Sequence, residues 1–176
     1  DQAYDVFRRF FALPAEVKNA YASRCGGQRG YTPFGIEQAR DGQAPDLKEF
    51  WHVGREMAGT NPWPDILEPN IWPVEVPGFR ETSLALFEEL DSLANVILVL
   101  IAASLRLDKN WFDEPVKNGN SILRAIHYPP LEEAPDGAVR AARHEDINLI
   151  TLLIGSDEAG LEILSRDCEW VPVTSI

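Results

Sequence analysis

The sequence predicts an α+β protein in which helices come first and short antiparallel strands follow, in a barrel or jelly-roll arrangement. Two observations lead to this fold class. Apolar residues recur at helical spacing only before about residue 107, whereas residues 121–176 alternate short strand-like runs with turns that contain proline or glycine. The chain has 176 residues, of which 45% are hydrophobic, which is the composition of a folded globular protein.

The helices of the first half are predicted from apolar spacing and from proline. Residues 2–12 carry apolar side chains at helical intervals, and Pro14 suits the first turn of a second short helix that ends near Tyr21. A long helix over about residues 78–107 is expected to act as a brace for the sheet. Its predicted apolar stripe consists of Leu86, Leu90, Leu93, Ile97, Leu100, Ile101 and Leu105.

Strands are predicted over residues 30–36, 47–53, 121–128, 161–164 and 170–173, which are rich in β-branched and aromatic residues. In the second of these, Lys48, Phe50 and His52 share one face, while Glu49 and Trp51 share the other. Because neither face is purely apolar, this strand is expected at a sheet margin beside a cavity. A lone histidine between aromatic neighbours is more often packed or hydrogen-bonded than bound to a metal, so His52 is not assigned as a ligand.

Residues 143–154 combine a His-x-Asp pair with a long apolar run, and a strand is predicted there. In an extended chain His144 and Asp146 project to the same side, so both can reach one ion, whereas Glu145 points away. An imidazole and a carboxylate suit iron, zinc or manganese better than calcium or magnesium. A His-x-Asp tripeptide by itself is more often a solvated surface pair, and its context has to decide.

The charge and cysteine content narrow the classes of partner. A net charge of −12 argues against a general nucleic-acid or anionic-membrane surface, because phosphate binding needs a concentrated positive field. The longest apolar run, residues 96–103, is far too short to cross a bilayer. The two cysteines form no Cys-x-x-Cys pair, which is typical of a reducing cytoplasm. A cytoplasmic monomer that acts on a small molecule is expected.

Several short motifs, taken in chain order, resemble the isopenicillin N synthase-like branch of the non-haem iron(II), 2-oxoglutarate-dependent dioxygenases. Each motif is weak alone, but their shared order is specific. The matching pieces are Leu13-Pro14-Ala15-Glu16-Val17-Lys18, Gly30-Tyr31, Asp46-Leu47-Lys48-Glu49, Arg124 with Tyr128-Pro129, His144-Glu145-Asp146 with Leu149-Ile150-Thr151-Leu152-Leu153, Gly160-Leu161-Glu162-Ile163, and Trp170 with Val173.

The resemblance implies N-terminal helices packed on a double-stranded β-helix, with residues 1–118 as the N-terminal region and residues 119–176 as the first part of the jelly-roll domain. It further implies iron(II), 2-oxoglutarate and dioxygen as cofactor and co-substrates, and hydroxylation, desaturation or cyclisation of a small molecule. His144 and Asp146 are the implied metal ligands, and no catalytic residue beyond these ligands is assigned. Tyr128 matches a position that contacts the co-substrate or substrate carboxylate.

The sequence also departs from the family pattern. The second histidine ligand and the Arg-x-Ser pair that grips 2-oxoglutarate are expected after residue 176, and the opening strand of the family is absent as well. The remaining histidines, His52 and His127, precede the motif and are not assigned as the third ligand. The chain is therefore expected to be a fragment with an incomplete jelly roll, inactive by itself.

Two other functions stay open at this point. One is an iron-dependent oxidase that does not use 2-oxoglutarate, since the Arg-x-Ser region that would discriminate is not in the chain. The other is a non-catalytic β-sandwich binding module in which His144 and Asp146 are surface residues.

Overall fold

The computed structural model describes residues 2–23, 28–38, 44–57, 67–131, 138–155 and 160–173. The chain forms two compact units, Asp1–Glu145 and Asp146–Ile176. The predicted domain boundary between residues 118 and 119 stays a prediction. None of the helices in the described ranges combines the length and the hydrophobicity that crossing a membrane requires.

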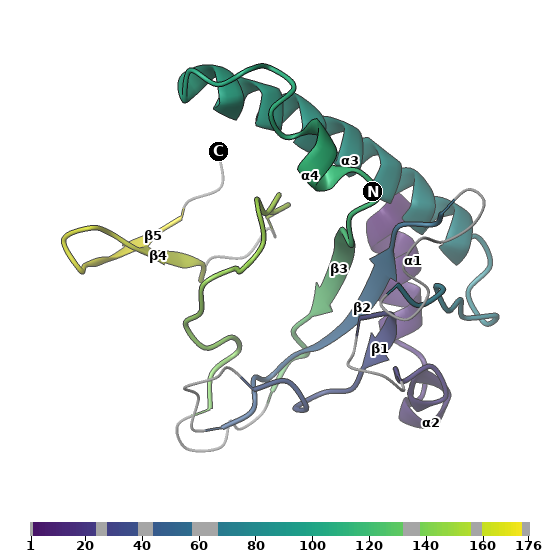
Figure 1. Cartoon of the computed structure of the whole chain (residues 1–176). Helices are drawn as coiled ribbons and strands as arrows, with labels where there is room; N and C mark the ends of the chain where they lie inside the picture. Colours follow the sequence, from purple (N-terminus) through teal and green to yellow (C-terminus); the bar gives the residue numbers. More distant parts are fainter. Residues whose placement is uncertain are drawn as a thin grey trace. The chain divides into compact units, whose positions relative to one another are not determined.

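The first unit is built on an antiparallel sheet with the strand order β1-β2-β3 (Figure 1). These strands are β1 (Gly30–Thr32), β2 (Glu49–Gly54) and β3 (Ile122–His127). Strand β2 is the central strand and every residue in it is buried, so its predicted place at a sheet margin is wrong. The faces of this segment are mixed in polarity because the charged side chains of Lys48 and Glu49 are buried in ion pairs.

Strand β1 is shorter than the predicted run of residues 30–36 because the chain turns directly after it. Pro33 cannot donate a ladder hydrogen bond, and Gly35 adopts a positive φ of 68° in the turn that follows. The register pairs Tyr31 with Trp51 and Thr32 with Phe50. The side chains of Tyr31 and Trp51 therefore lie on the same face of the sheet.

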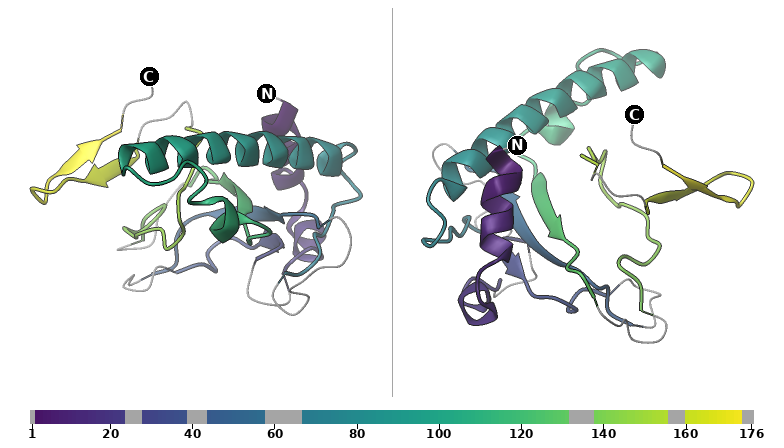
Figure 2. Two further views of the ribbon diagram at one scale, coloured as in Figure 1. Left: turned by 45° about the horizontal axis from the view of Figure 1, so that its top comes forward. Right: turned by 180° about the vertical axis from the view of Figure 1, so that it is seen from behind.

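The described part of the first unit contains four helices, and Figure 2 shows them from two further directions. The predicted helices of the first half are confirmed as α1 (Gln2–Phe11), α2 (Ala15–Asn19) and α3 (Phe79–Ser104). Pro14 directly precedes α2, as expected from its fixed φ, and Gly78 precedes α3 with a φ of 81° that favours glycine. After the long helix the chain forms a single helical turn, α4 (Asp113–Val116).

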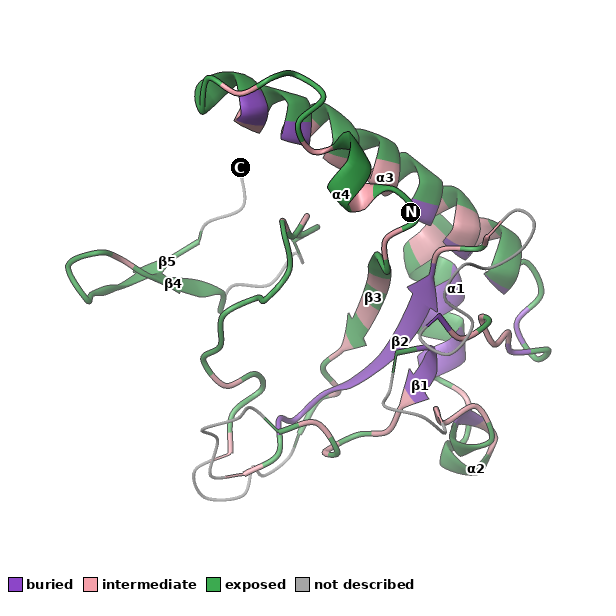
Figure 3. Ribbon diagram, in the orientation of Figure 1, coloured by how far each residue is buried: buried purple, intermediate pink, exposed green. Residues whose placement is uncertain are grey.

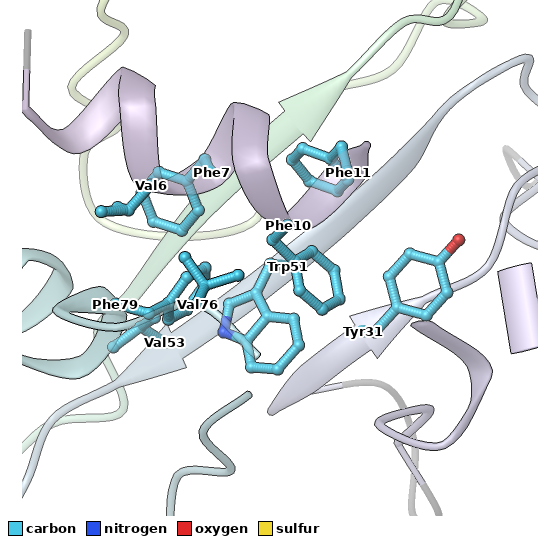
Figure 4. Packing of buried hydrophobic residues seen from close by; sticks show 9 residues of the cluster. All are labelled: Val6, Phe7, Phe10, Phe11, Tyr31, Trp51, Val53, Val76 and Phe79. Atoms are coloured by element: carbon cyan, nitrogen blue, oxygen red, sulfur yellow. The ribbon is translucent and has the colours of Figure 1, made fainter. Parts of the chain in front are cut away.

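The hydrophobic core of the first unit lies between α1, the start of α3 and one face of the sheet (Figure 4). Phe10 and Trp51 are both fully buried, with ring centroids 4.6 Å apart in an edge-to-face arrangement. Phe79 at the start of α3 lies 5.1 Å from both Trp51 and Phe7. These aromatic contacts hold α1 and α3 to the centre of β2.

The apolar stripe predicted for the long helix is partly wrong. The buried residues of α3 are Phe79, Ser83, Phe87, Leu98 and Ala102, whereas Leu100 is 64% exposed and Leu93 and Leu105 are also exposed (Figure 3). The helix is apolar around much of its circumference, so the spacing alone did not indicate which face packs. The contacts of α1 and β2 with α3 select the face that begins at Phe79.

The described residues of the second unit form a two-stranded antiparallel sheet, β4 (Glu162–Leu164) and β5 (Trp170–Pro172), close to the predicted strands.

The strand predicted over residues 143–154 is wrong for this structure, which has no strand from Ala142 to Gly155. Ile147 is fully exposed, and Leu149, Leu153 and Ile154 are exposed too. A strand needs a neighbour for its backbone hydrogen bonds, and strands β4 and β5 pair with each other. The α+β class with antiparallel sheets is confirmed.

A matched pair of phenylalanine substitutions tests the core. Phe10→Ala should lower the free energy of unfolding by about 3–5 kcal/mol, since it removes a fully buried ring. Phe34→Ala removes the same atoms from a side chain that is 39% exposed and should cost about 1 kcal/mol or less. Urea unfolding measures both values, and equal losses would contradict the assigned core.

Candidate functional site

The side chains of β2 alternate between two faces of the sheet, and each face carries a charged network. Glu49, Trp51 and Val53 face the core, whereas Phe50 and His52 face the opposite side, as does Lys48 directly before the strand. Strand β3 adds Arg124 to this opposite side because Arg124 pairs with His52 in the register. The two networks join distant segments of the first unit.

The core-side network is centred on the buried carboxylate of Glu49. Lys18 Nζ lies 2.8 and 3.0 Å from its two oxygens and also donates to the carbonyl oxygen of Phe11 at 3.1 Å. The hydroxyl of Tyr31 donates to the same carboxylate, and His127 Nδ1 lies 2.8 Å from Glu49 Oε1. This network ties helix α2 and strands β1 and β3 to the central strand.

These hydrogen bonds determine the charge states of Glu49 and Tyr31. Burial alone would raise the pKa of Glu49, but the hydrogen bonds from Lys18, Tyr31 and His127 outweigh it and lower the pKa. Burial, together with the bond to the Glu49 carboxylate, raises the pKa of Tyr31. Glu49 is therefore an anion held by donors on three sides, and Tyr31 is a neutral donor.

The second network lies on the opposite side of β2. Lys48 Nζ lies 2.8 Å from Asp46 Oδ2 and 2.7 Å from Glu37 Oε2. Glu37 also meets Arg124 Nη1 at 3.3 Å, and Arg124 Nε donates to His52 Nε2 at 2.6 Å. The guanidinium of Arg124 lies 4.5 Å from the centroid of the Phe50 ring. Asp46, Lys48 and His52 are buried, while Arg124 is exposed.

Tyr128, the predicted co-substrate residue, directly follows β3 and is 39% exposed. Arg124 and Ile126 lie on the exposed face of β3, and the same alternation assigns Tyr128 to that face. On this face the guanidinium of Arg124 already contacts Glu37 and His52. The role of Tyr128 stays a prediction.

His144, the first predicted metal ligand, is exposed at the end of the first unit. Its Nδ1 lies 2.8 Å from the carbonyl oxygen of Ala142. A carbonyl only accepts hydrogen bonds, so Nδ1 carries the proton and the lone pair of the neutral ring is on Nε2. This is the arrangement of metal-binding histidines, which usually donate the other ring N–H to a carbonyl or carboxylate.

Asp146, the second predicted ligand, opens the second unit. One of its oxygens accepts a hydrogen bond from the hydroxyl of Thr151, and Thr151 Oγ1 in turn lies 2.9 Å from Asn148 Nδ2. Both ligand candidates thus have a local partner that restrains the side chain.

The donor types fit a divalent transition metal, but a complete site is not present in the described residues. Within the described ranges, no group of three or more histidine, cysteine, aspartate or glutamate side chains is placed to hold a metal ion. His52 Nε2 accepts a hydrogen bond from Arg124, and His127 Nδ1 contacts Glu49. Their assignment as non-ligands stays a prediction.

The sequence did not reveal the part that Asp46 plays. Asp46 Oδ1 accepts a hydrogen bond from the backbone N–H of Ala142 at 3.0 Å, two residues before His144. The Asp46-Leu47-Lys48-Glu49 motif marked the residue, but its partner is 96 positions away in the chain. Only the folded arrangement brings the two together.

Known proteins are similar to this chain over nearly its whole length. Residues 1–75 match the family described as non-haem dioxygenase in morphine synthesis N-terminal, and residues 119–176 match the 2OG-Fe(II) oxygenase superfamily. The 2-oxoglutarate-Fe(II) type oxidoreductase hxnY of Emericella nidulans is 32% identical over 98% of this chain and 52% of its own. The 2-oxoglutarate-dependent dioxygenase citB of Monascus ruber is 35% identical over 94% of this chain and 54% of its own.

Solved structures are similar too. A crystal structure described as a 2OG-Fe(II) oxygenase family protein from Caulobacter crescentus has a TM-score of 0.89 and 44% identity, over all of this chain and 57% of its own. A full-length protein from Neurospora crassa, solved in complex with alpha-KG, has a TM-score of 0.81 and 30% identity, over 99% of this chain and 56% of its own.

These matches define the class as that of non-haem iron oxygenases and confirm the resemblance drawn from the motifs. The chain belongs to the 2OG-Fe(II) oxygenase superfamily. It spans about half the length of the curated relatives that it matches, 52% and 54% of the two named above.

The pH dependence of stability tests the Glu49 network. The pKa of Glu49 is lowered in the folded state, so its contribution is complete above the unfolded-state pKa and is lost as the pH falls through the folded-state pKa. Glu49→Gln should cost about 3–5 kcal/mol at neutral pH, because Lys18 would be left buried without its anion. It should also remove part of the acid-dependent loss of stability.

Thermal unfolding between neutral pH and the acid range measures this effect. Glu56→Gln, which removes an exposed ion pair with Arg80, is the matched control and should unfold as the wild type does. An unchanged acid profile in Glu49→Gln would contradict the assignment.

Proposed function

We propose that the full-length protein is an iron(II)- and 2-oxoglutarate-dependent dioxygenase that oxidises a small molecule by hydroxylation, desaturation or cyclisation. The observation that carries the proposal is His144, which belongs to the segment that matches the oxygenase superfamily and donates Nδ1–H to a backbone carbonyl. The names of the relatives hxnY and citB, both of which refer to 2-oxoglutarate, support the choice of co-substrate.

In this proposal His144 Nε2 and one carboxylate oxygen of Asp146 bind the metal, and the third ligand comes from outside residues 1–176. Iron(II) in such a site supplies the activation of dioxygen, coupled to the oxidative decarboxylation of 2-oxoglutarate. The backbone carbonyl of Ala142 fixes the His144 tautomer, and Thr151 orients the Asp146 carboxylate. We assign no other catalytic group in the chain.

We further propose that the strands of the chain belong to a double-stranded β-helix that is complete only in the full-length protein. The similarity to the oxygenase structures from Caulobacter crescentus and Neurospora crassa supports this architecture. In that setting the apolar run over residues 146–154 would pair with neighbouring strands and lose its exposure. We expect the full-length protein to be a monomer and to be located in the cytoplasm.

Substitution of the two ligands tests the function most simply. His144→Ala and Asp146→Ala should each reduce 2-oxoglutarate turnover by the full-length protein to background, because each removes a metal donor. Glu145→Ala alters the residue between them and should retain activity. Full activity in either ligand variant would contradict the proposal.

A metal-dependent melting temperature provides a second measurement that does not need turnover. Mn(II) at about 100 times its Kd should stabilise the wild type by about 2.7 kcal/mol, and neither ligand variant should respond. A wild type without any metal response would favour a non-catalytic binding module. Substrate-dependent dioxygen uptake without 2-oxoglutarate would indicate the oxidase instead.

Tyr128 provides a separate prediction. Tyr128→Phe should raise the KM for 2-oxoglutarate by about 10- to 100-fold, because a hydrogen bond to a carboxylate is lost. Tyr21→Phe removes a hydroxyl that binds Glu75 and the Val74 backbone instead, and it should leave this KM unchanged. Steady-state kinetics of the two variants would distinguish them, and equal KM values would remove Tyr128 from the site.

A further inference from the structure

The backbone of Ala142 connects a buried carboxylate to the candidate metal ligand. Its N–H donates to Asp46 Oδ1 at 3.0 Å, and its carbonyl oxygen accepts the hydrogen bond from His144 Nδ1 at 2.8 Å. The two groups flank one Cα atom, so a displacement of the N–H displaces the carbonyl as well. The position of the imidazole is thereby coupled to the position of the Asp46 side chain.

A second hydrogen bond attaches the same segment to the chain just before β2. The backbone N–H of Leu47 donates to the carbonyl oxygen of Val139 at 3.0 Å. Residues 139–142 are thus fixed at two points to two consecutive residues, Asp46 and Leu47. This attachment lies immediately before His144 and does not depend on a regular strand there.

Asp46 is suited to this task because it is rigid as well as buried. It is 2% exposed, and its second oxygen binds Lys48, which is 4% exposed. Lys48 is held in turn by Glu37, and Glu37 meets Arg124 on strand β3. A carboxylate with both oxygens engaged in a buried ion network has little freedom to move.

We propose that Asp46 is a positioning residue for the metal: through the Ala142 backbone it holds His144 in the orientation and tautomer that present Nε2 to the ion. This inference rests on the proposed function only in taking His144 as a ligand. Partners that orient a metal-binding histidine typically change metal affinity by about 10- to 100-fold when they are removed. Asp46 should therefore contribute to metal affinity although it does not touch the metal.

A matched pair of double variants of the full-length protein separates positioning from simple stability. Asp46→Asn with Lys48→Met removes the buried charges but keeps an oxygen that can accept the Ala142 N–H. Asp46→Leu with Lys48→Met has nearly the same shape and lacks that oxygen. Replacement of a buried ion pair by residues of similar volume is often neutral for stability, so both variants are expected to fold.

The first measurement is the Kd for Mn(II). The electron paramagnetic resonance signal of unbound Mn(II) reports the concentration of free ion during the titration. The variant with asparagine should bind Mn(II) within about 3-fold of the wild type, and the variant with leucine about 10- to 100-fold more weakly. Equal Kd values for the two variants would overturn the inference. A variant with leucine that binds as the wild type does would overturn it as well.

The second measurement is the His144 tautomer in the metal-free protein, read from the imidazole ¹⁵N chemical shifts and assigned with His144→Gln. The wild type and the variant with asparagine should show the proton on Nδ1, and the variant with leucine should lose this preference. A retained Nδ1 proton in the leucine variant would contradict the inference.

The outcomes also distinguish this inference from the proposed function. If His144→Ala loses Mn(II) binding but the two double variants bind alike, the function stands and the positioning role of Asp46 is wrong. If the wild type itself does not bind Mn(II), both are wrong.

Discussion

Lys48, which directly precedes β2, and Glu49, its first residue, carry opposite charges on opposite faces of a fully buried segment, and the rest of the first unit depends on how they are paired. A buried charge without a partner costs several kcal/mol, so each face of β2 must supply one. Lys18 of helix α2 approaches Glu49 on the core side, and Asp46 and Glu37 approach Lys48 on the other. These ion pairs join helix α2, Glu37 and Asp46 to the central strand and the residue before it.

The same constraint connects the fold to the proposed chemistry. On the core side His127 reaches Glu49 from β3, and on the opposite side Arg124 reaches Glu37. Side-chain contacts therefore join β3, which leads to Tyr128, to β2 on both faces. His127 contacts Glu49 on the core side, and Arg124 contacts His52 on the other. Asp46 extends the second network to Ala142 and so to the backbone next to His144. The candidate ligand His144, which lies on an exposed segment, thereby follows a backbone that is fixed to Asp46.

Local patterns predicted the elements well, and long-range contacts account for the errors. The spacing of Phe7, Phe10 and Phe11 and the position of Pro14 are local signals, and they identified α1 and α2. The face of α3 could not be identified, since a helix that is apolar on most sides packs where its neighbours are. The strand over residues 143–154 could not form from its own residues, because its ladder requires a partner. Asp46 was marked by a motif, but its hydrogen bond to Ala142 depends on the folded chain.

We propose that the chain contributes an oriented histidine and a carboxylate to an iron site, and a crystal structure of the full-length protein with Mn(II) and 2-oxoglutarate would test this proposal. We expect Mn(II) on His144 Nε2 and on an Asp146 oxygen, with His144 Nδ1 hydrogen-bonded to the Ala142 carbonyl and Asp46 accepting from the Ala142 N–H. Metal bound at other residues, or through His144 Nδ1, would contradict it.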